Sequence, residues 1–130
     1  MRAEIKKVID NSKEVQVLLN NMKIVDSEIL EIIQSIKQQR PNVKTITFKN
    51  NQIGDEGAKI LADELVSVPS LAWLDMQLNQ IDKSGMMALF TLRAKNPGLK
   101  LDLYGNKVTD AIEAEEMARG PISSQTYPRR

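Results

Sequence analysis

Cysteine and histidine are both absent from this chain of 130 residues. Without cysteine there can be no disulfide, no thiolate metal site and no thiol nucleophile, and nothing requires an oxidising compartment. Without histidine the chain lacks the commonest general base and the commonest transition-metal ligand. Most catalytic and metal-binding templates are therefore excluded. We expect a protein that is not an enzyme, with no catalytic residue, no metal site and no cofactor.

Long apolar runs and a strong net charge are missing too. No stretch approaches the ~20 apolar residues of a membrane-spanning helix, and residues 1–14 lack the apolar core of a secretory signal. Eighteen Lys and Arg against seventeen Asp and Glu give a net charge of +1, so no global field attracts nucleic acid or an anionic membrane. We expect one soluble domain, made without an N-terminal export signal, that binds neither nucleic acid nor a membrane.

What the chain does have is an internal repeat of about 28 residues. Three prolines recur at a spacing of 28, and three asparagines recur at spacings of 28 and 27. They are Pro41, Pro69 and Pro97, and Asn51, Asn79 and Asn106. Self-similarity at this period indicates a solenoid, in which each unit buries its apolar face against its neighbours.

Each repeat begins with a short alternating apolar run. The runs occupy residues 43–53, 71–81 and 99–108, and each ends in Asn-x-Ile or Asn-x-Val. An alternation of period two predicts a half-buried strand. The residues predicted to point inward are Ile46 and Phe48, Leu74 and Met76, and Leu101 and Leu103, with Thr47, Asp75 and Asp102 between them pointing outward.

Each run is followed by a segment with helical periodicity. These segments are residues 55–68, 83–96 and 110–120, with Gly54, Asp82 and Thr109 at their N-cap positions. Proline ends the first two helices, and Gly120 with Pro121 ends the last. Met86, Met87, Leu89, Phe90 and Leu92 make the second helix apolar over a wider arc. Part of this arc is expected to be core, and for Phe90, which stands where the preceding repeat has Ala62, the alternative is a second contact surface.

The first repeat is irregular. Residues 14–22 fit a strand with Val15, Val17, Asn20 and Met22 in the repeat pattern, although the spacing from Asn20 to the next asparagine of the series is 31. A helix is predicted at residues 27–39, directly behind Asp26.

The two ends of the chain depart from the repeat. Ile5, Val8 and Ile9 lie at helical spacing and are placed to cover the flank that a terminal repeat otherwise exposes. We therefore divide the chain into an N-terminal capping helix at residues 1–13, a repeat domain at 14–120 and a disordered C-terminal tail at 121–130.

The run ITFKNNQIGDEGAKILADEL (46–65) resembles the ribonuclease-inhibitor type of leucine-rich repeat (LRR), and the likeness extends over about residues 14–118. The resemblance implies a short α/β solenoid of three to four repeats with an N-terminal helical cap. It also implies parallel strands on a concave face, helices on the convex face, and a protein partner on the concave strand residues. Leu19 to Lys23 are similar to a stretch of the tropomodulin repeat domain.

The asparagines at the strand exits are expected to be structural. A buried amide at that point can satisfy the backbone groups of the turn and stack on its counterparts in a ladder. The series is Asn20, Asn51, Asn79 and Asn106.

The outward strand residues form the first candidate binding surface. They align across three strands about 4.8 Å apart and so make one patch. The patch consists of Thr45, Thr47, Lys49, Trp73, Asp75, Gln77, Lys100, Asp102 and Tyr104. Trp and Tyr are enriched at binding hot spots, so we predict a protein partner with Trp73 and Tyr104 as anchors. The alternative is that Trp73 only covers the aliphatic stem of a neighbour.

Asp75 and Asp102 form a second candidate site. On neighbouring strands their carboxylates can approach the ~5 Å separation that retaining glycosidases use. An Asp at this position is ordinary for the repeat, however, and no histidine or phosphate-binding loop accompanies the pair. The GDEGA segment lacks the lysine of a nucleotide loop and is better interpreted as a helix start. We expect Lys100 to offset the charge and no catalysis to occur.

The third candidate is the C-terminal segment. Glu113, Glu115 and Glu116 followed by a small, polar end resemble the C-terminal signals of effectors that intracellular bacteria deliver by type IV secretion. This implies a short bacterial protein, located in the cytoplasm or delivered into a host cell by a type IV-like route. The plainer interpretation is a solvated helix face and a frayed tail.

The alternative to a binding module is a structural or self-associating scaffold, which implies a homodimer.

Overall fold

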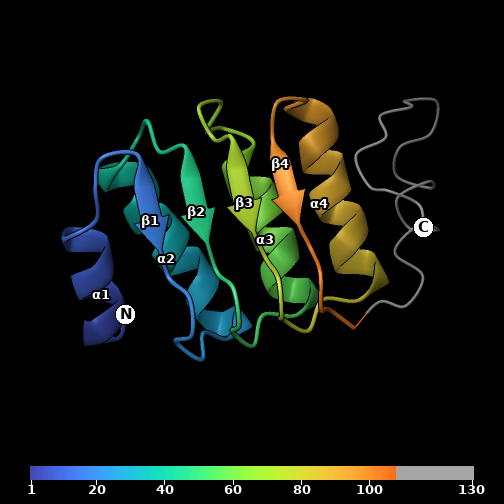
Figure 1. Ribbon diagram of the computed structural model, residues 1–130, viewed down its shortest axis with the longest axis horizontal. Coiled ribbons are helices and arrows are strands. Elements are labelled where there is room, and N and C mark those ends of the chain that lie inside the picture. Colours follow the sequence, from blue (N-terminus) through green and yellow to red (C-terminus); the bar gives the residue numbers. More distant parts are fainter. Residues whose placement is uncertain (108–130) are drawn as a thin grey trace.

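Helices and strands alternate along the chain in the computed structural model, which describes residues 1–107. The strands are β1 (Gln16–Leu18), β2 (Thr45–Thr47), β3 (Trp73–Asp75) and β4 (Lys100–Asp102). The helices are α1 (Ala3–Asp10), α2 (Asp26–Gln39), α3 (Asp55–Leu65) and α4 (Lys83–Lys95). Within residues 1–107 the strands form one parallel sheet in chain order, as Figure 1 shows.

The register of the sheet follows the alternation in the sequence. Val17 pairs with Ile46, Ile46 with Leu74, and Leu74 with Leu101, and all four side chains are buried. The inward-facing pairs predicted for β2, β3 and β4 are confirmed, because all six of their side chains lie in the core.

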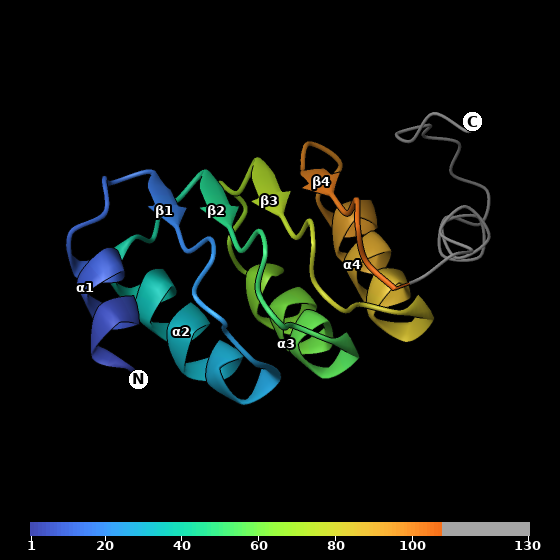
Figure 2. The ribbon, with the colours of Figure 1, turned by 60° about the horizontal axis from the view of Figure 1, so that its bottom comes forward.

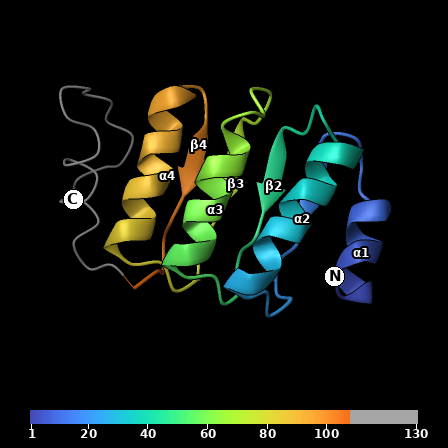
Figure 3. The same ribbon diagram turned by 180° about the vertical axis from the view of Figure 1, so that it is seen from behind.

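The helices cover one face of the sheet and leave the other face open. Figure 2 shows the strands as one layer and the helices as a second, and Figure 3, the view from behind, shows α2, α3 and α4 in front of the sheet. Packed helices need about 8–10 Å between axes, whereas neighbouring strands stand about 4.8 Å apart, so the stack curves with the strands on the inside. The predicted α/β solenoid, with strands on the concave face and helices on the convex face, is confirmed.

Helix α1 covers the N-terminal flank of this stack. Ile5 and Ile9 of α1 are fully buried against the first repeat. The Arg2 guanidinium donates from Nε to Glu28 Oε2 at 2.7 Å and from Nη2 to the Met22 carbonyl oxygen at 2.7 Å. The hydrogen bond from Arg2 lowers the pKa of Glu28 and raises the pKa of Arg2 itself, because it favours the charged form of both partners.

Arg40 fastens the other end of α1. Its Nη2 donates to the carbonyl oxygens of Ile9, Asp10 and Ser12 at 3.3, 3.3 and 3.0 Å, and its Nε donates to Ser12 Oγ at 3.0 Å. These groups lie at the helix C-terminus, where carbonyl oxygens have no partner within the helix. One guanidinium therefore satisfies the end of α1 and ties it to the end of α2.

The GDEGA segment connects neighbouring repeats. The Asp26 carboxylate accepts from the Gly54 N–H at 2.6 Å, and Asp55 Oδ1 accepts from the N–H groups of Asp82 at 2.7 Å and Gly85 at 3.0 Å. A Cβ at Gly57 would lie 2.6 Å from Asp26 Oδ1, and one at Gly85 would lie 2.6 Å from Asp55 Oδ1. The glycine of the motif thus leaves room for the carboxylate of the preceding repeat.

Several details of the sequence prediction differ from the structure. Helix α2 begins at Asp26, with Val25 as its N-cap, and α3 ends at Leu65 rather than at residue 68. Val15 is exposed, since the inward pair of the first strand is Val17 and Leu19. Phe90 is buried, with the Arg93 guanidinium carbon 4.8 Å from its ring centroid, so it does not mark an exposed contact surface.

The predicted ladder position of the first repeat is also wrong. The register of β1 against β2 places Met22 opposite Asn51, so Asn20 stands two residues too early. Asn20 Oδ1 instead accepts from the Lys49 N–H at 2.8 Å. The anomalous spacing of 31 has this cause.

Several predictions fall outside the described residues 1–107. They are the helix at 110–120 with its N-cap Thr109 and its stop at Gly120 and Pro121, the glutamates Glu113, Glu115 and Glu116, and the tail at 121–130.

Candidate protein-binding surface

The asparagine ladder fixes the carboxyl ends of the strands. Asn51 Oδ1 accepts from the N–H groups of Met22 and Ile24 at 2.9 and 3.0 Å, and its Nδ2 donates to the carbonyl oxygens of Leu19 and Phe48, both at 2.9 Å. One buried amide thereby joins two repeats. The residues that make the equivalent bonds in the next repeats are Asn79 and Asn106. The predicted structural role of these three residues is confirmed.

The sheet brings the nine predicted surface residues together in three rows. Thr45 pairs with Trp73 and Trp73 with Lys100, so these residues form the first row. The strand register places the second and third rows directly after it, and these consist of Thr47, Asp75 and Asp102, and of Lys49, Gln77 and Tyr104. We call this set the open strand face.

Trp73 is held in place by its neighbours on β4. Its Nε1 donates to Asp102 Oδ2 at 2.7 Å, and Lys100 Nζ lies 5.7 Å from the centroid of the indole ring. The hydrogen bond satisfies the polar atom of the indole, and the ammonium is within the range of a cation–π contact. The half-buried Trp73 therefore has one orientation, and part of the indole remains exposed on the open strand face.

Two residues of the open strand face lie below its surface. Asp75 is 5% exposed and accepts from the backbone N–H and Nε2 of Gln77, both at 3.0 Å. Thr47 is 4% exposed, and its hydroxyl has no hydrogen-bond partner within the described residues. Both alternate with the core residues along their strands, as predicted, but they are buried, so their effect on a partner is indirect.

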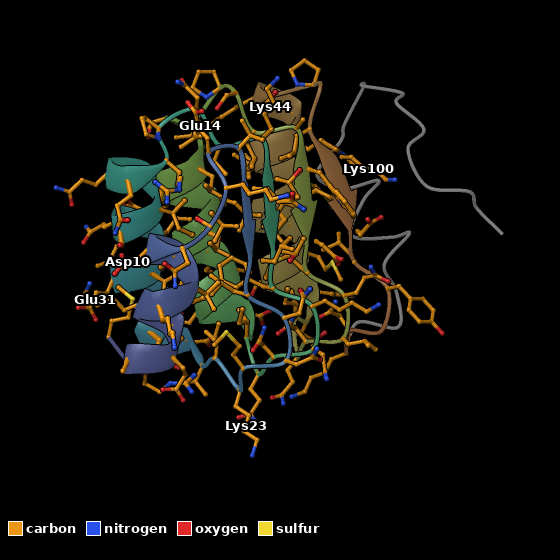
Figure 4. The ribbon with its side chains drawn as sticks, turned by 60° about the vertical axis from the view of Figure 1, so that its left-hand side comes forward. Asp10, Glu14, Lys23, Glu31, Lys44 and Lys100 are labelled. Atoms are coloured by element: carbon orange, nitrogen blue, oxygen red, sulfur yellow. The ribbon has the colours of Figure 1, made fainter. Side chains whose placement is uncertain are left out.

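The most exposed positions on this side are Tyr104, Lys49, Lys100 and Leu18. Tyr104 is 78% exposed, and Figure 4 shows Lys100 projecting from β4. Sequence analysis missed Leu18, which pairs with Thr47 and extends the second row onto β1. The signal was its place between the buried Val17 and Leu19 in the alternation.

The charged side chains that are fully exposed on and beside the open strand face are lysines. The carboxylates of Asp75 and Asp102 already accept hydrogen bonds from neighbours on the sheet. Lys49 and Lys100, and Lys44 just before β2, have no ion pair within residues 1–107. A partner surface with exposed carboxylates would complement these three lysines.

The two carboxylates of the predicted pair accept hydrogen bonds from neighbouring side chains. One oxygen atom of each carboxylate accepts a hydrogen bond that orients a neighbouring side chain, Gln77 for Asp75 and Trp73 for Asp102. Among residues 1–107 no group of three or more Asp and Glu side chains is placed to hold a metal ion. No helix in this part of the chain is long and apolar enough to span a membrane.

Comparison with known proteins identifies the repeats. The family model described as Leucine Rich repeat matches residues 41–62 and 70–90. Each matched segment contains a strand, its asparagine turn and the first part of the following helix. No curated protein matches the chain in sequence. With four parallel strands covered by helices over residues 1–107, the chain forms a short α/β leucine-rich-repeat solenoid.

Proposed function

We propose that this domain binds a protein partner through its open strand face, with Trp73 and Tyr104 as anchors. Leucine-rich repeats are in general protein–protein interaction modules, and curved solenoids offer their concave side to partners. The observation that carries the proposal is the place of the single tryptophan of the chain. It stands on the open strand face, locked by Asp102 and Lys100, rather than in the core.

Preorganisation makes this arrangement suited to binding. An aromatic side chain that already has one orientation loses little conformational entropy when a partner covers it, and Trp and Tyr supply most of the energy at many interfaces. In this proposal Lys49 and Lys100 attract an acidic partner surface, and Thr45 and Gln77 contribute complementarity at the rim. Thr47 and Asp75 act from below by supporting their neighbours.

The experiment is partner capture by three single variants. Trp73→Ala and Tyr104→Ala are each expected to weaken capture of the same partner by about tenfold or more, with thermal unfolding unchanged for Tyr104→Ala. Val66→Ala is the control, since Val66 is an exposed apolar residue on the opposite, helical side. Equal capture by all three variants would reject the open strand face as the binding site.

The runner-up function is self-association, with this chain as a structural scaffold or homodimer. A dimer through the open strand face would bury the same two aromatic residues, so capture alone does not separate the two functions. Light scattering over a dilution series does, because a monomer at every concentration would exclude self-association. A catalytic role for Asp75 is disfavoured by the hydrogen bonds that occupy its carboxylate, and Asp75→Asn is the control for a hydrolase screen.

We further propose that the repeats are of the ribonuclease-inhibitor type and that the chain is a bacterial effector. The support is the resemblance of residues 46–65 and of the C-terminal segment from Glu113 onward. A reporter fused upstream of the full chain tests delivery into host cells. Equal delivery after removal of residues 113–130 would reject the signal.

A further inference from the structure

The turns that follow the four strands share one unusual backbone conformation. The residues at equivalent positions have positive φ angles of 61°, 61°, 58° and 80°. They are Asn21, Asn50, Leu78 and Gly105. Glycine and asparagine adopt this left-handed conformation readily, whereas a leucine is strained in it. The third repeat therefore carries a strained residue where its neighbours carry relaxed ones.

Leu78 does not belong to the hydrophobic core. Leu78 is 41% exposed. A Cβ at Gly105 would lie 2.5 Å from Leu78 Cδ2. The Leu78 side chain therefore packs against Gly105 in space that any other residue would fill. Its N–H donates to the carbonyl oxygen of Tyr104 at 2.8 Å. Strain that is not offset by burial is typical of sites where a side chain is held for binding.

Leu78 lies in a groove of about 530 Å³ that runs across these turns. The other lining residues are Asn21, Lys23, Asn50, Asn51, Gln52, Asn79, Gln80 and Gly105. Most of them carry side-chain amides, and Leu78 is the only large apolar residue among these described lining residues. We call this feature the turn groove. Its lining residue Lys23 is labelled in Figure 4, at the edge of the molecule.

The amides of the turn groove suit the main chain of an extended peptide. A side-chain amide both donates and accepts, as a peptide unit does. Gln52 and Gln80 are exposed, and no hydrogen bond of their side chains forms within residues 1–107. Asn51 and Asn79, by contrast, belong to the ladder and are already satisfied.

The two ends of the turn groove differ in chemistry. Leu78 follows β3, and Lys23 follows β1 and has no ion pair within the described residues. Two strand spacings of ~4.8 Å separate these turns by ~9.6 Å. About three residues of extended chain, at ~3.3 Å each, cover that distance.

We propose that the turn groove binds an extended peptide segment of a partner protein, with a large apolar side chain and an acidic side chain about three residues apart. The apolar side chain packs on Leu78, the carboxylate pairs with Lys23, and the peptide main chain bonds to the amides of Gln52 and Gln80. This site is separate from the open strand face and does not depend on it.

A displayed library of random 12-residue peptides tests the proposal. It is selected on the full chain and, in parallel, on the Leu78→Asn variant, in which Asn restores the residue type of Asn21 and Asn50. Enriched peptides are expected to pair a large apolar residue with Asp or Glu two to five positions away. The dissociation constant of the most enriched peptide should rise about tenfold in Leu78→Asn and again in Lys23→Glu.

Two controls separate groove binding from other causes. Leu30→Asn replaces a leucine of similar exposure, 43%, on α2, and Trp73→Ala alters the open strand face; both should leave the peptide affinity unchanged. The melting temperature of Leu78→Asn should stay level or rise, and a fall of more than about 4 °C would show that leucine is kept for packing and overturn the proposal.

Three further outcomes would overturn it. One is that the enriched peptides lack acidic residues, or that the same peptides are enriched equally on Leu78→Asn. Another is loss of peptide binding in Trp73→Ala but not in Leu78→Asn, which would move the site to the open strand face and leave the proposed function standing. The last is displacement of the peptide by a 12-nucleotide single-stranded DNA at equal concentration, which would identify a nucleic-acid site.

Discussion

The N-terminal flank and the open strand face use their charged side chains in opposite ways. On the flank, both guanidinium groups have partners within the fold. Arg2 donates to Glu28, and Arg40 donates to Ser12 and to carbonyl oxygens at the end of α1. On the open strand face, Lys49 and Lys100 have no ion pair within residues 1–107. All five ion pairs found in these residues involve α1, α2 or their neighbours.

This difference separates what holds the solenoid together from what it offers to a partner. The apolar flank of a terminal repeat must be covered. The polar groups of the N-terminal flank therefore form the hydrogen bonds that attach α1. The strand side is stabilised from below by the core and the asparagine ladder. The exposed side chains of the open strand face therefore contribute little to stability, and substitutions of them should affect binding more than folding.

The largest effect should come from breaking the flank at its apolar contact. Ile9→Ala removes a fully buried side chain and should lower the free energy of unfolding by about 2–5 kcal/mol. Val15→Ala, at an exposed position nearby, should change it by less than about 0.5 kcal/mol. Urea denaturation measures both, and similar losses in the two variants would mean that α1 is not a structural cap.

A smaller loss is expected when the guanidinium that ties α1 to α2 is removed. Arg40→Ala leaves the carbonyl oxygens at the end of α1 without their donor and should cost about 2 kcal/mol, the range for hydrogen bonds to a charged group. Lys44→Ala is the control on the strand side. If both variants lose the same stability, the contrast between flank and face is not real.

A gain is expected on the open strand face. Thr47→Val keeps the shape of the side chain and removes a buried hydroxyl that has no partner within residues 1–107, so the free energy of unfolding should rise by about 1 kcal/mol. Thr45→Val, at a half-buried position on the same strand, is the matched control and should show no such gain. A loss of stability in Thr47→Val would show that the hydroxyl has a bonding role.

The smallest effect concerns pH. The folded-state pKa of Glu28 lies below its ordinary value of 4.5 because Arg2 donates to it, so the stabilisation is present above pH 4.5 and is lost as pH falls through the folded pKa. Glu28→Gln should lower stability by about 0.5 kcal/mol at pH 7, and the difference from the unmodified chain should narrow as pH falls below 4.5. Glu14→Gln is the control, and a gap that is constant with pH would exclude the ion pair as its cause.

The sequence predicted the repeat architecture because the same physical requirement recurs in each unit. Alternation identified the inward side chains, and the in-phase asparagines identified the turns of Asn51, Asn79 and Asn106. The first repeat misled this reasoning at Asn20. Since β1 has no preceding strand in the described sheet, a side chain at its ladder position has no earlier repeat to join, and Met22 can occupy it.

Other features depend on contacts between repeats that a single strand pattern does not encode. Alternation placed Thr47 and Asp75 on the outward side and did not predict that they are buried there, and the orientation of Trp73 arises from Asp102 on the next strand. The carboxylate bonds of Asp55 had a signal in the glycines of GDEGA, but their partners lie one repeat away. The positive φ of Leu78 had none, because leucine is not a turn residue.

The most direct test of the central claim is a photo-crosslink from the open strand face. p-Benzoylphenylalanine is placed at position 104 in one protein and at position 66, on the helical side, in another, because Tyr104 and Val66 are both exposed. The account predicts that a partner protein is crosslinked from position 104 and not from position 66. A partner crosslinked from position 66 alone would contradict it.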